Sequence, residues 1–408
     1  MADIKTDEKF MAIALDLAEK GRGTTSPNPM VGAVVVKDGK IVGKGWHKKA
    51  GTPHGEAIAL EKAGKLAEGG TLYVNLEPCC HKDKLTPPCT EAVISSKVAR
   101  VVVAMADPNP KVSGRGIERL KEAGIEVETG VLGERAMRLN EAFTKYITTG
   151  YPYVTLKVAQ TLDGKIATAS GESKWITGPE ARKLGHRLRN QSDAIMIGVG
   201  TVLKDDPSLT TRIEDMPETR DPHRVILDSH LRVPLDAKAL NLASRAKTYI
   251  ATTLSASTGR MKEIKAKKAE ILIIDADENG RVSIPALMEE LAKLGMTNIL
   301  LEGGARINAA VLRAGMVDKA MFFIAPKILG GDDARGSVGG GSPDSLDKAV
   351  ELTCVHHTTV GQDILVEGYV ESGKVAVSGK AVDYTPAVSC SVKKKRRRKP
   401  RKDAGGSE

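Results

Sequence analysis

Long apolar runs are missing from this sequence of 408 residues. None approaches the roughly 18 consecutive apolar residues that a membrane-spanning helix needs, so we expect no membrane association. The opening residues MADIKTDEKF also lack the apolar core of a secretion signal, which predicts a cytoplasmic protein. Apolar residues make up 41% and charged residues 27% of the chain, as is typical of globular proteins, and the length predicts two or three domains.

Cysteine is scarce, and its five copies are unevenly placed. Cys79, Cys80 and Cys89 fall within eleven residues, whereas Cys354 and Cys390 stand alone. An odd number of cysteines without a secretion signal argues against a disulfide framework. A tight cluster in a cytoplasmic chain is more typical of a metal site or a catalytic site.

Positive charge is in excess overall, but most of the chain carries little of it. Of the net charge of +10, all but +3 belongs to the end of the chain, where nine Lys or Arg residues lie between Lys393 and Lys402. Such a run cannot bury a core, so we expect residues 371–408 to be a solvated, disordered extension. The same run is a candidate for weak, non-specific contact with nucleic acid.

Residues 1–147 alternate between strand and helix patterns, which predicts an α/β domain. Asp38-Gly39 between two apolar runs indicates a β-hairpin. The expected helices span 7–20, 55–67, 90–96, 116–123 and 135–146, and the expected strands span 31–36, 41–46, 71–76, 98–104 and 126–130.

Gly150 and Pro152 mark the expected boundary to a second α/β domain, residues 151–370. This part contains no G-x-G-x-x-G, so a Rossmann fold is not supported. Leu300-Leu301-Glu302-Gly303-Gly304 instead resembles a strand-to-helix turn, which by itself is only a weak sign of phosphate binding. The expected helix spans 180–190, and the expected strands span 153–159, 194–199, 224–228, 247–252, 271–275 and 298–302.

His54, Cys79 and Cys89 are the candidate metal ligands. One imidazole and two thiolates suit a tetrahedral Zn²⁺ that keeps its fourth position for water. Glu56, two residues after His54, is suited to carry protons, and zinc lowers the pKa of water to near 7. A closed structural zinc site, with Cys80 or His81 as fourth ligand, is the alternative.

Several motifs occur in a fixed order that is similar to one enzyme family, the bacterial bifunctional deaminase/reductases of riboflavin biosynthesis. The resemblance covers about residues 7–370. The first half carries Thr25-Ser26-Pro27-Asn28-Pro29, Pro53-His54-Gly55-Glu56, Leu76-Glu77-Pro78-Cys79 and Thr86-Pro87-Pro88-Cys89, and the second carries Thr161-Leu162-Asp163-Gly164-Lys165, Lys174-Trp175-Ile176-Thr177 and Ile324-Ala325-Pro326-Lys327.

The resemblance implies a cytidine-deaminase-like three-layer domain followed by a dihydrofolate-reductase-like domain, and a homo-oligomer. It implies zinc-dependent deamination of 2,5-diamino-6-(5-phosphoribosylamino)pyrimidin-4(3H)-one, then NADPH-dependent reduction of the ribosyl group to the ribityl product. Two departures stand out. Gly55 replaces the usual Ala, and the loop at residues 80–86, with His81, Lys84 and Thr86, is one residue longer than in the family.

The resemblance also assigns residues to roles. Glu56 and Lys157 are implied as catalytic residues. The NADPH site would be lined by Ala159, Trp175, Thr201, Asp205, Ser229, Gly304, Ala305, Arg306, Ile307, Asn308, Ala309 and Ala310, the last seven as a turn. The substrates would be held by Asn28, His47, Ser173, Arg189, Leu209, Arg212 and Glu302.

Other interpretations stay open at this point. Trp175 alone is equally typical of core packing, and Arg189 of a surface ion pair. A deaminase of tRNA or free nucleosides would also use zinc, with the tail binding RNA, but normally has C-x-x-C where nine residues separate Cys79 from Cys89 here. A nucleic-acid-binding module with structural zinc would show salt-sensitive binding and release no ammonia.

Overall fold

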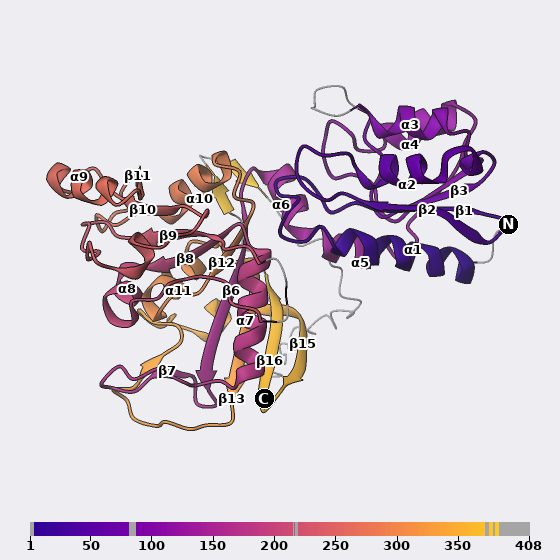
Figure 1. The fold of residues 1–408 in the computed structure, drawn as a ribbon. Coiled ribbons are helices and arrows are strands. Elements are labelled where there is room, and N and C mark those ends of the chain that lie inside the picture. Colours follow the sequence, from indigo (N-terminus) through magenta and orange to yellow (C-terminus); the bar gives the residue numbers. More distant parts are fainter. Residues whose placement is uncertain are drawn as a thin grey trace, which may run out of the picture.

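The computed structural model describes residues 4–80, 87–214, 216, 219–371, 375–377 and 380–382. The chain builds two large sheets, one from the N-terminal third and one from the rest (Figure 1). The first sheet has the order β2-β1-β3-β4-β5, with β1 antiparallel to both neighbours and β3, β4 and β5 parallel. Its strands are β1 (Gly32–Lys37), β2 (Lys40–Trp46), β3 (Thr71–Val74), β4 (Arg100–Val103) and β5 (Glu126–Thr129).

Helices cover both faces of this sheet, which confirms the expected three layers (Figure 1). Successive strand residues point to opposite faces, so Ala33 and Val35 enter one core and Val34 and Val36 the other. The first core is closed by α2 (Gly55–Ala63), α3 (Cys89–Ser95) and α4 (Arg115–Glu122). The second core is closed by α1 (Ile4–Glu19) and α5 (Gly133–Leu139).

The single helix expected over 135–146 is wrong, because the chain forms α5 and then α6 (Glu141–Thr149), with Asn140 between them. The Asn140 side chain is buried and bonds the backbone of Met30: its Oδ1 accepts from the Met30 N–H at 2.8 Å and its Nδ2 donates to the Met30 carbonyl at 3.0 Å. This pair of bonds fixes the break in the helix.

The second sheet has the order β11-β10-β9-β8-β12-β6-β13-β16-β15. Its strands from β11 to β13 are parallel, and the antiparallel pair β16 and β15 completes one edge. The parallel strands are β6 (Tyr153–Thr161), β8 (Ala194–Gly198), β9 (His223–Leu227), β10 (Thr248–Thr252), β11 (Glu270–Ile273), β12 (Asn298–Leu301) and β13 (Lys319–Ala325).

Helices again lie on both faces of this sheet. Those on one face are α10 (Ile284–Lys293) and α11 (Ala305–Arg313). Those on the other are α7 (Pro179–Gln191), α8 (Val199–Asp205) and α9 (Thr258–Ala266). The expected α/β class is confirmed for both halves.

Several strands were not expected from the sequence, and one of them is the parallel strand β13. The edge pair is β15 (Leu352–Val360) and β16 (Asp363–Val370), and a small pair joins β7 (Lys165–Ala167) to β14 (Arg335–Gly336). Within the segment expected to be disordered, β17 (Val375–Val377) pairs with β18 (Lys380–Val382), while the basic run lies outside the described residues. Across the described ranges, no helix has the length and apolar character that crossing a bilayer requires.

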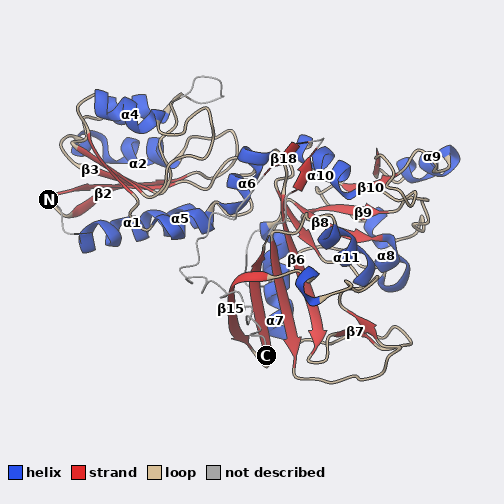
Figure 2. Cartoon of the chain, turned by 180° about the vertical axis from the view of Figure 1, so that it is seen from behind, coloured by secondary structure: helices blue, strands red, loops and turns tan. Residues whose placement is uncertain are grey.

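Helix α6 lies where the two sheets meet (Figure 2). The Lys145 Nζ donates to Asp318 Oδ2 at 2.6 Å, and both side chains are buried. Asp318 Oδ2 also accepts the Val154 N–H of β6 at 2.7 Å. This buried ion pair fastens α6 to the second sheet.

Candidate active sites

The three candidate metal ligands converge at one end of the first sheet. His54 is the N-cap of α2, Cys89 is the first residue of α3, and Cys79 lies in the segment after β3. Their ligand atoms all lie within 4.8 Å of one another, with the His54 Nδ1 3.6 Å from the Cys79 Sγ and 3.4 Å from the Cys89 Sγ. One imidazole and two buried thiols at this spacing fit Zn²⁺. Cys80 is not part of the cluster among the residues described, and His81, Lys84 and Thr86 lie outside them.

Glu56 lies beside this cluster, in the first turn of α2, and is 2% exposed. Its Oε2 is buried and has no hydrogen-bond partner within the described part of the chain. Burial raises the pKa of Glu56 above its ordinary value, with the neighbouring thiol of Cys79 acting in the same direction. An unpaired buried carboxylate oxygen is costly, so this oxygen is available to a ligand bound at the cluster.

Glu77 holds the segment that carries Cys79, a role that sequence reasoning missed. Its two carboxylate oxygens accept four backbone N–H groups, from Asp107, Gly114, Gly116 and Ile117, at 2.8–3.2 Å. A Cβ at position 116 would lie 2.2 Å from the Pro78 carbonyl oxygen, so α4 and the Pro78-Cys79 segment touch backbone to backbone. The only sequence signal was that Glu77 follows a strand directly and precedes a ligand.

Asn28 and His47, expected to hold the ring and ribose, lie next to the metal ligands. The Asn28 Nδ2 is 3.3 Å from the His47 Nε2, and the His47 ring centre is 5.0 Å from that of His54. The His47 Nδ1 is 3.2 Å from the Pro53 carbonyl oxygen, which can only accept, so the proton of a neutral His47 is on Nδ1. Nε2 is then the acceptor for the Asn28 amide.

A second cluster of charged groups lies in the nine-stranded sheet. Glu302 follows β12, and Arg189 of α7 donates to both of its carboxylate oxygens at 2.9 and 2.7 Å. The Lys157 Nζ of β6 is 3.8 Å from the Glu302 Oε2. Burial alone would raise the pKa of Glu302, but the charges of Arg189 and Lys157 lower it to about 2. Arg189 is thus an ion-pair partner of Glu302, and its contact with substrate stays a prediction.

His186 joins this cluster and was not expected from the sequence. Its Nδ1 accepts the Arg212 N–H at 3.2 Å, and burial together with the charges of Arg189 and Arg212 lowers the pKa of His186 to about 4. A neutral His186 therefore helps to hold the backbone of the exposed Arg212. The other expected substrate residues are the buried Leu209 and the half-buried Ser173.

The candidate cofactor site lies at the start of α11. Residues 305–310 are the first turns of this helix and not a turn connecting two elements, which corrects the expectation. Ile307, Asn308 and Ala309 are buried, Arg306 is exposed, and the Asn308 Oδ1 has no partner among the described residues. A Cβ at position 304 would lie 3.8 Å from the Thr201 Oγ1, so this helix N-terminus adjoins α8 and is suited to receive phosphate.

Trp175 is 64% exposed, which contradicts the interpretation of ordinary core packing. The Arg182 guanidinium lies 4.6 Å from its ring centre, and the Lys327 Nζ donates to its carbonyl at 2.7 Å. A large aromatic side chain held in place yet open to solvent suits stacking on a planar ligand. Ala159, Asp205 and Ser229, the other expected cofactor residues, are half-buried.

Two family models match the chain. The RibD C-terminal domain matches residues 152–366, and the cytidine and deoxycytidylate deaminase zinc-binding region matches residues 4–105. The riboflavin biosynthesis protein RibD of Aquifex aeolicus is 46% identical over 360 residues, 88% of this chain and 97% of that protein. RibD of Escherichia coli is 44% identical over 340 residues, 81% of this chain and 90% of that protein.

Solved structures agree with these matches. RibD of Acinetobacter baumannii superposes with a TM-score of 0.81 at 38% identity, covering 90% of this chain and 99% of that one. A diaminohydroxyphosphoribosylaminopyrimidine deaminase/5-amino-6-(5-phosphoribosylamino)uracil reductase of Thermotoga maritima has a TM-score of 0.78 at 36% identity, with the same coverage. The similarity therefore extends over both sheets and both candidate sites.

Proposed function

Because this chain belongs to the RibD family of riboflavin-biosynthesis enzymes, we propose which of its residues carry out each of the two reactions of that family. The chain is a bifunctional deaminase and reductase, with a zinc-binding deaminase domain and an NADPH-dependent reductase domain. We place the deaminase in residues 1–147 and the reductase in 151–370, with 371–408 as a tail. The solved Thermotoga relative supplies the substrates proposed below.

In the deaminase, His54, Cys79 and Cys89 would hold zinc, and the substrate is 2,5-diamino-6-(5-phosphoribosylamino)pyrimidin-4(3H)-one. A bound zinc ion acts as a Lewis acid that makes hydroxide available near neutral pH. Glu56 takes up the proton from the attacking water and returns protons to the ring nitrogen and the departing ammonia. Its unpaired buried oxygen supports this assignment. Asn28 and His47 hold the ring and the ribose.

In the reductase, the substrate is 5-amino-6-(5-phosphoribosylamino)uracil, whose opened ribose presents an imine at C1′. NADPH supplies the hydride that reduces this carbon. Lys157 donates a proton to the imine nitrogen, while Glu302 holds the Lys157 and Arg189 charges in place. Arg212 is suited to the substrate phosphate, with Arg189, Ser173 and Leu209 beside it.

The NADPH contacts combine side chains and backbone. Trp175 offers an exposed ring, and the N-terminus of α11 is suited to receive phosphate. The buried Ile307 and Ala309 would contribute through their backbone. The remaining lining residues are Ala159, Thr201, Asp205, Ser229, Gly304, Ala305, Arg306, Asn308 and Ala310.

Two further proposals concern the setting of the enzyme. Small pyrimidine phosphates are its substrates, and we place it in the cytoplasm as a homo-oligomer, as the family resemblance implies. Sedimentation of the purified protein tests the assembly. The basic tail is proposed to make at most weak, non-specific contact with nucleic acid.

The observation that carries this function is the convergence of His54, Cys79 and Cys89 beside Glu56, whose Oε2 has no partner among the described residues. The test supplies the pyrimidinone phosphate with and without NADPH and follows ammonia and NADPH absorbance. We expect ammonia in both cases and NADPH oxidation only after deamination. Activity on tRNA or cytidine alone would refute the proposal.

The first prediction concerns Glu56→Gln. We expect zinc content to match the wild type and ammonia release to fall at least about 100-fold, because the proton carrier is lost. The control is Glu91→Gln, which alters an exposed carboxylate of α3 near Arg119 and leaves turnover unchanged. Wild-type turnover in Glu56→Gln would remove Glu56 from the mechanism.

A further inference from the structure

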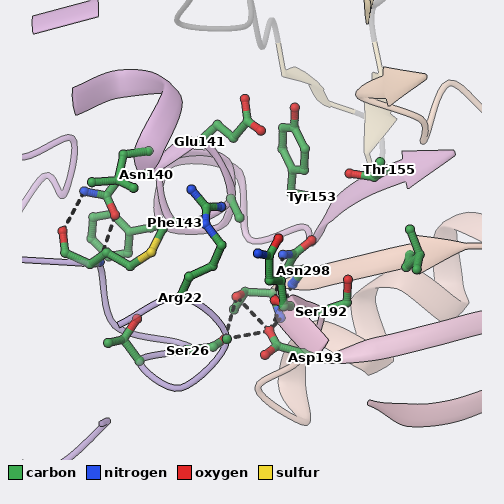
Figure 3. A pocket seen from close by; sticks show the side chains of 18 of the residues that line it. Arg22, Ser26, Asn140, Glu141, Phe143, Tyr153, Thr155, Ser192, Asp193 and Asn298 are labelled. Carbon is green, nitrogen blue, oxygen red and sulfur yellow. Dashed lines mark hydrogen bonds between the residues drawn. The ribbon is translucent and has the colours of Figure 1, made fainter. Parts of the chain in front are cut away.

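A short loop of the deaminase half, residues 21–28, is bonded directly to the reductase sheet. The Ser26 Oγ donates to the Asp193 Oδ2 at 2.6 Å (Figure 3). It also lies 2.7 Å from the Thr297 Oγ1. These contacts join positions 167 and 271 residues apart in the sequence. The loop is therefore bonded to both halves of the enzyme, because its Thr24 Oγ1 also donates to the Lys48 carbonyl of the deaminase half at 2.7 Å.

Asp193 is a rigid acceptor. It is buried and directly precedes β8, and the same Oδ2 accepts the backbone N–H groups of Thr297 at 2.9 Å and Asn298 at 3.1 Å. Asn298 is the first residue of β12, so the carboxylate ties two neighbouring strands together. A side chain that bonds to Asp193 is therefore held in a fixed position relative to β8 and β12.

The same loop also contacts residues of the deaminase site. Residues 25–28 form a turn in which the Asn28 N–H donates to the Thr25 carbonyl at 2.8 Å. Asn28 at the end of this turn donates to His47, whose ring lies against His54. A continuous path of contacts therefore runs from Asp193 through Ser26 and Asn28 to the metal-ligand side of the site.

The loop also contacts the end of α7, at Gly23. A Cβ at position 23 would lie 2.7 Å from the Asn190 carbonyl oxygen, and its φ of +80° is unfavourable for other residues. The backbone of the loop thus approaches the end of α7 as closely as a glycine permits. This contact is independent of the Ser26 bonds and places the loop at the same edge of the sheet.

A cavity of about 210 Å³ borders the loop on its inner side (Figure 3). Ser26 and Asn28 line it from the deaminase half, and Asp193 and Thr297 line it from the reductase half. Sites for drug-sized ligands are larger, at roughly 300–1,000 Å³. The cavity instead leaves the loop without close packing on that side, so the hydrogen bonds of Ser26 are its side-chain attachment to the reductase half there.

We propose that Asp193 and Thr297 of the reductase half are positioning residues for the deaminase, acting through Ser26 on Asn28 and His47. The proposal rests on the deaminase function proposed above. It means that the reductase sheet completes the substrate-binding side of the deaminase site, while the zinc ligands and Glu56 belong to the deaminase half.

Ser26→Ala in the full chain tests this coupling, because it removes one hydroxyl and leaves the bonds within the reductase sheet intact. We expect the KM for the pyrimidinone phosphate in deamination to rise about five- to tenfold, as for the loss of one ordinary hydrogen bond. The deaminase kcat should stay within about twofold, and the reductase constants should not change. Ser26→Thr keeps the hydroxyl and should restore the wild-type KM.

Tyr369→Phe is the matched control, since the Tyr369 hydroxyl also crosses the junction, donating to the Glu141 Oε2 of α6 at 2.9 Å. It does not touch the loop and should leave the deaminase KM unchanged. A Ser26→Ala enzyme with the wild-type KM, or a rise that Ser26→Thr fails to reverse, overturns the coupling. Absence of ammonia release by the wild type would instead overturn the proposed function.

Discussion

Glu302 lies at the centre of the reductase cluster, where burial and charge act on it in opposite directions. Two cations, Arg189 and Lys157, hold its carboxylate ionised, with a pKa of about 2 against an ordinary 4.5. A lowered folded-state pKa stabilises the protein fully above about pH 4.5, and this stabilisation is lost as the pH falls towards 2. The difference corresponds to roughly 3 kcal/mol of unfolding free energy.

Glu302→Gln should remove this pH dependence. At pH 6 the variant should be less stable by about 3 kcal/mol, because Arg189 stays buried without its partner. The difference in unfolding free energy between the variant and the wild type should narrow between pH 4.5 and pH 3, because only the wild type loses the contribution of an ionised Glu302. Urea unfolding at pH 6, 4.5 and 3 measures both proteins. A gap that stays constant over this range would contradict the role of Glu302.

Among single residues, the sequence predicts those whose role follows from their own chemistry. It misses those whose role depends on partners far away in the sequence. The pattern His54, Glu56, Cys79 and Cys89 is readable because zinc needs those groups whatever surrounds them. Glu77 could not be recognised, because its role depends on N–H groups 30–40 residues further along. Residues such as Asp193, His186 and Asn140 are meaningful only through contacts that form on folding.

Among the elements, α6 is attached to the second sheet by the buried pair Lys145 and Asp318. Lys145→Met should lower the unfolding free energy by about 3–5 kcal/mol, because Asp318 is then a buried charge without its counter-ion. Lys145→Met/Asp318→Asn should recover part of this loss, since the charge is removed as well. Urea unfolding of the two single variants and the double variant forms a double-mutant cycle.

An additive result in that cycle would show that the pair is not coupled. Lys293→Met, which disrupts an exposed pair with Glu290 on α10, is the control and should cost less than about 1 kcal/mol. Comparison of Lys145→Met with Lys293→Met therefore shows whether burial of the ion pair causes the expected loss of unfolding free energy.

Element prediction from the sequence succeeded for most strands with a buried face and failed for exposed ones. The β1–β2 hairpin and the parallel strands other than β13 carry clear apolar runs and lie where expected, whereas β13 is largely buried and was nevertheless missed. β15 is an edge strand in which residues 355–359 are all exposed, so it has no alternation to detect. The separation of α5 from α6 depends on the Asn140–Met30 bonds, which no periodicity encodes.

For the whole molecule, the order of motifs predicted a deaminase followed by a reductase, and the family match bears this out. The way in which the two halves join could not be predicted. It depends on Ser26, Asp193 and α6, whose contacts link distant parts of the chain. The coupling proposed through Ser26 follows from this junction. Through it, the fusion of the two enzymes would affect substrate binding by the deaminase, and not only the distance between the two active sites.

The distribution of charge over the whole chain leads to the last prediction. Residues 1–392 carry a net charge of only +3, and both candidate sites lie within residues 28–310, so removal of residues 393–408 should leave kcat and KM unchanged for both reactions. The full chain should bind a single-stranded oligonucleotide weakly, and binding should weaken steeply between 50 and 200 mM salt, as expected when basic side chains displace counter-ions. Fluorescence anisotropy of both proteins with one labelled oligonucleotide measures this. If the shortened protein binds the oligonucleotide equally well, the nucleic-acid contact belongs to residues 1–392. If it loses either activity, the tail takes part in catalysis.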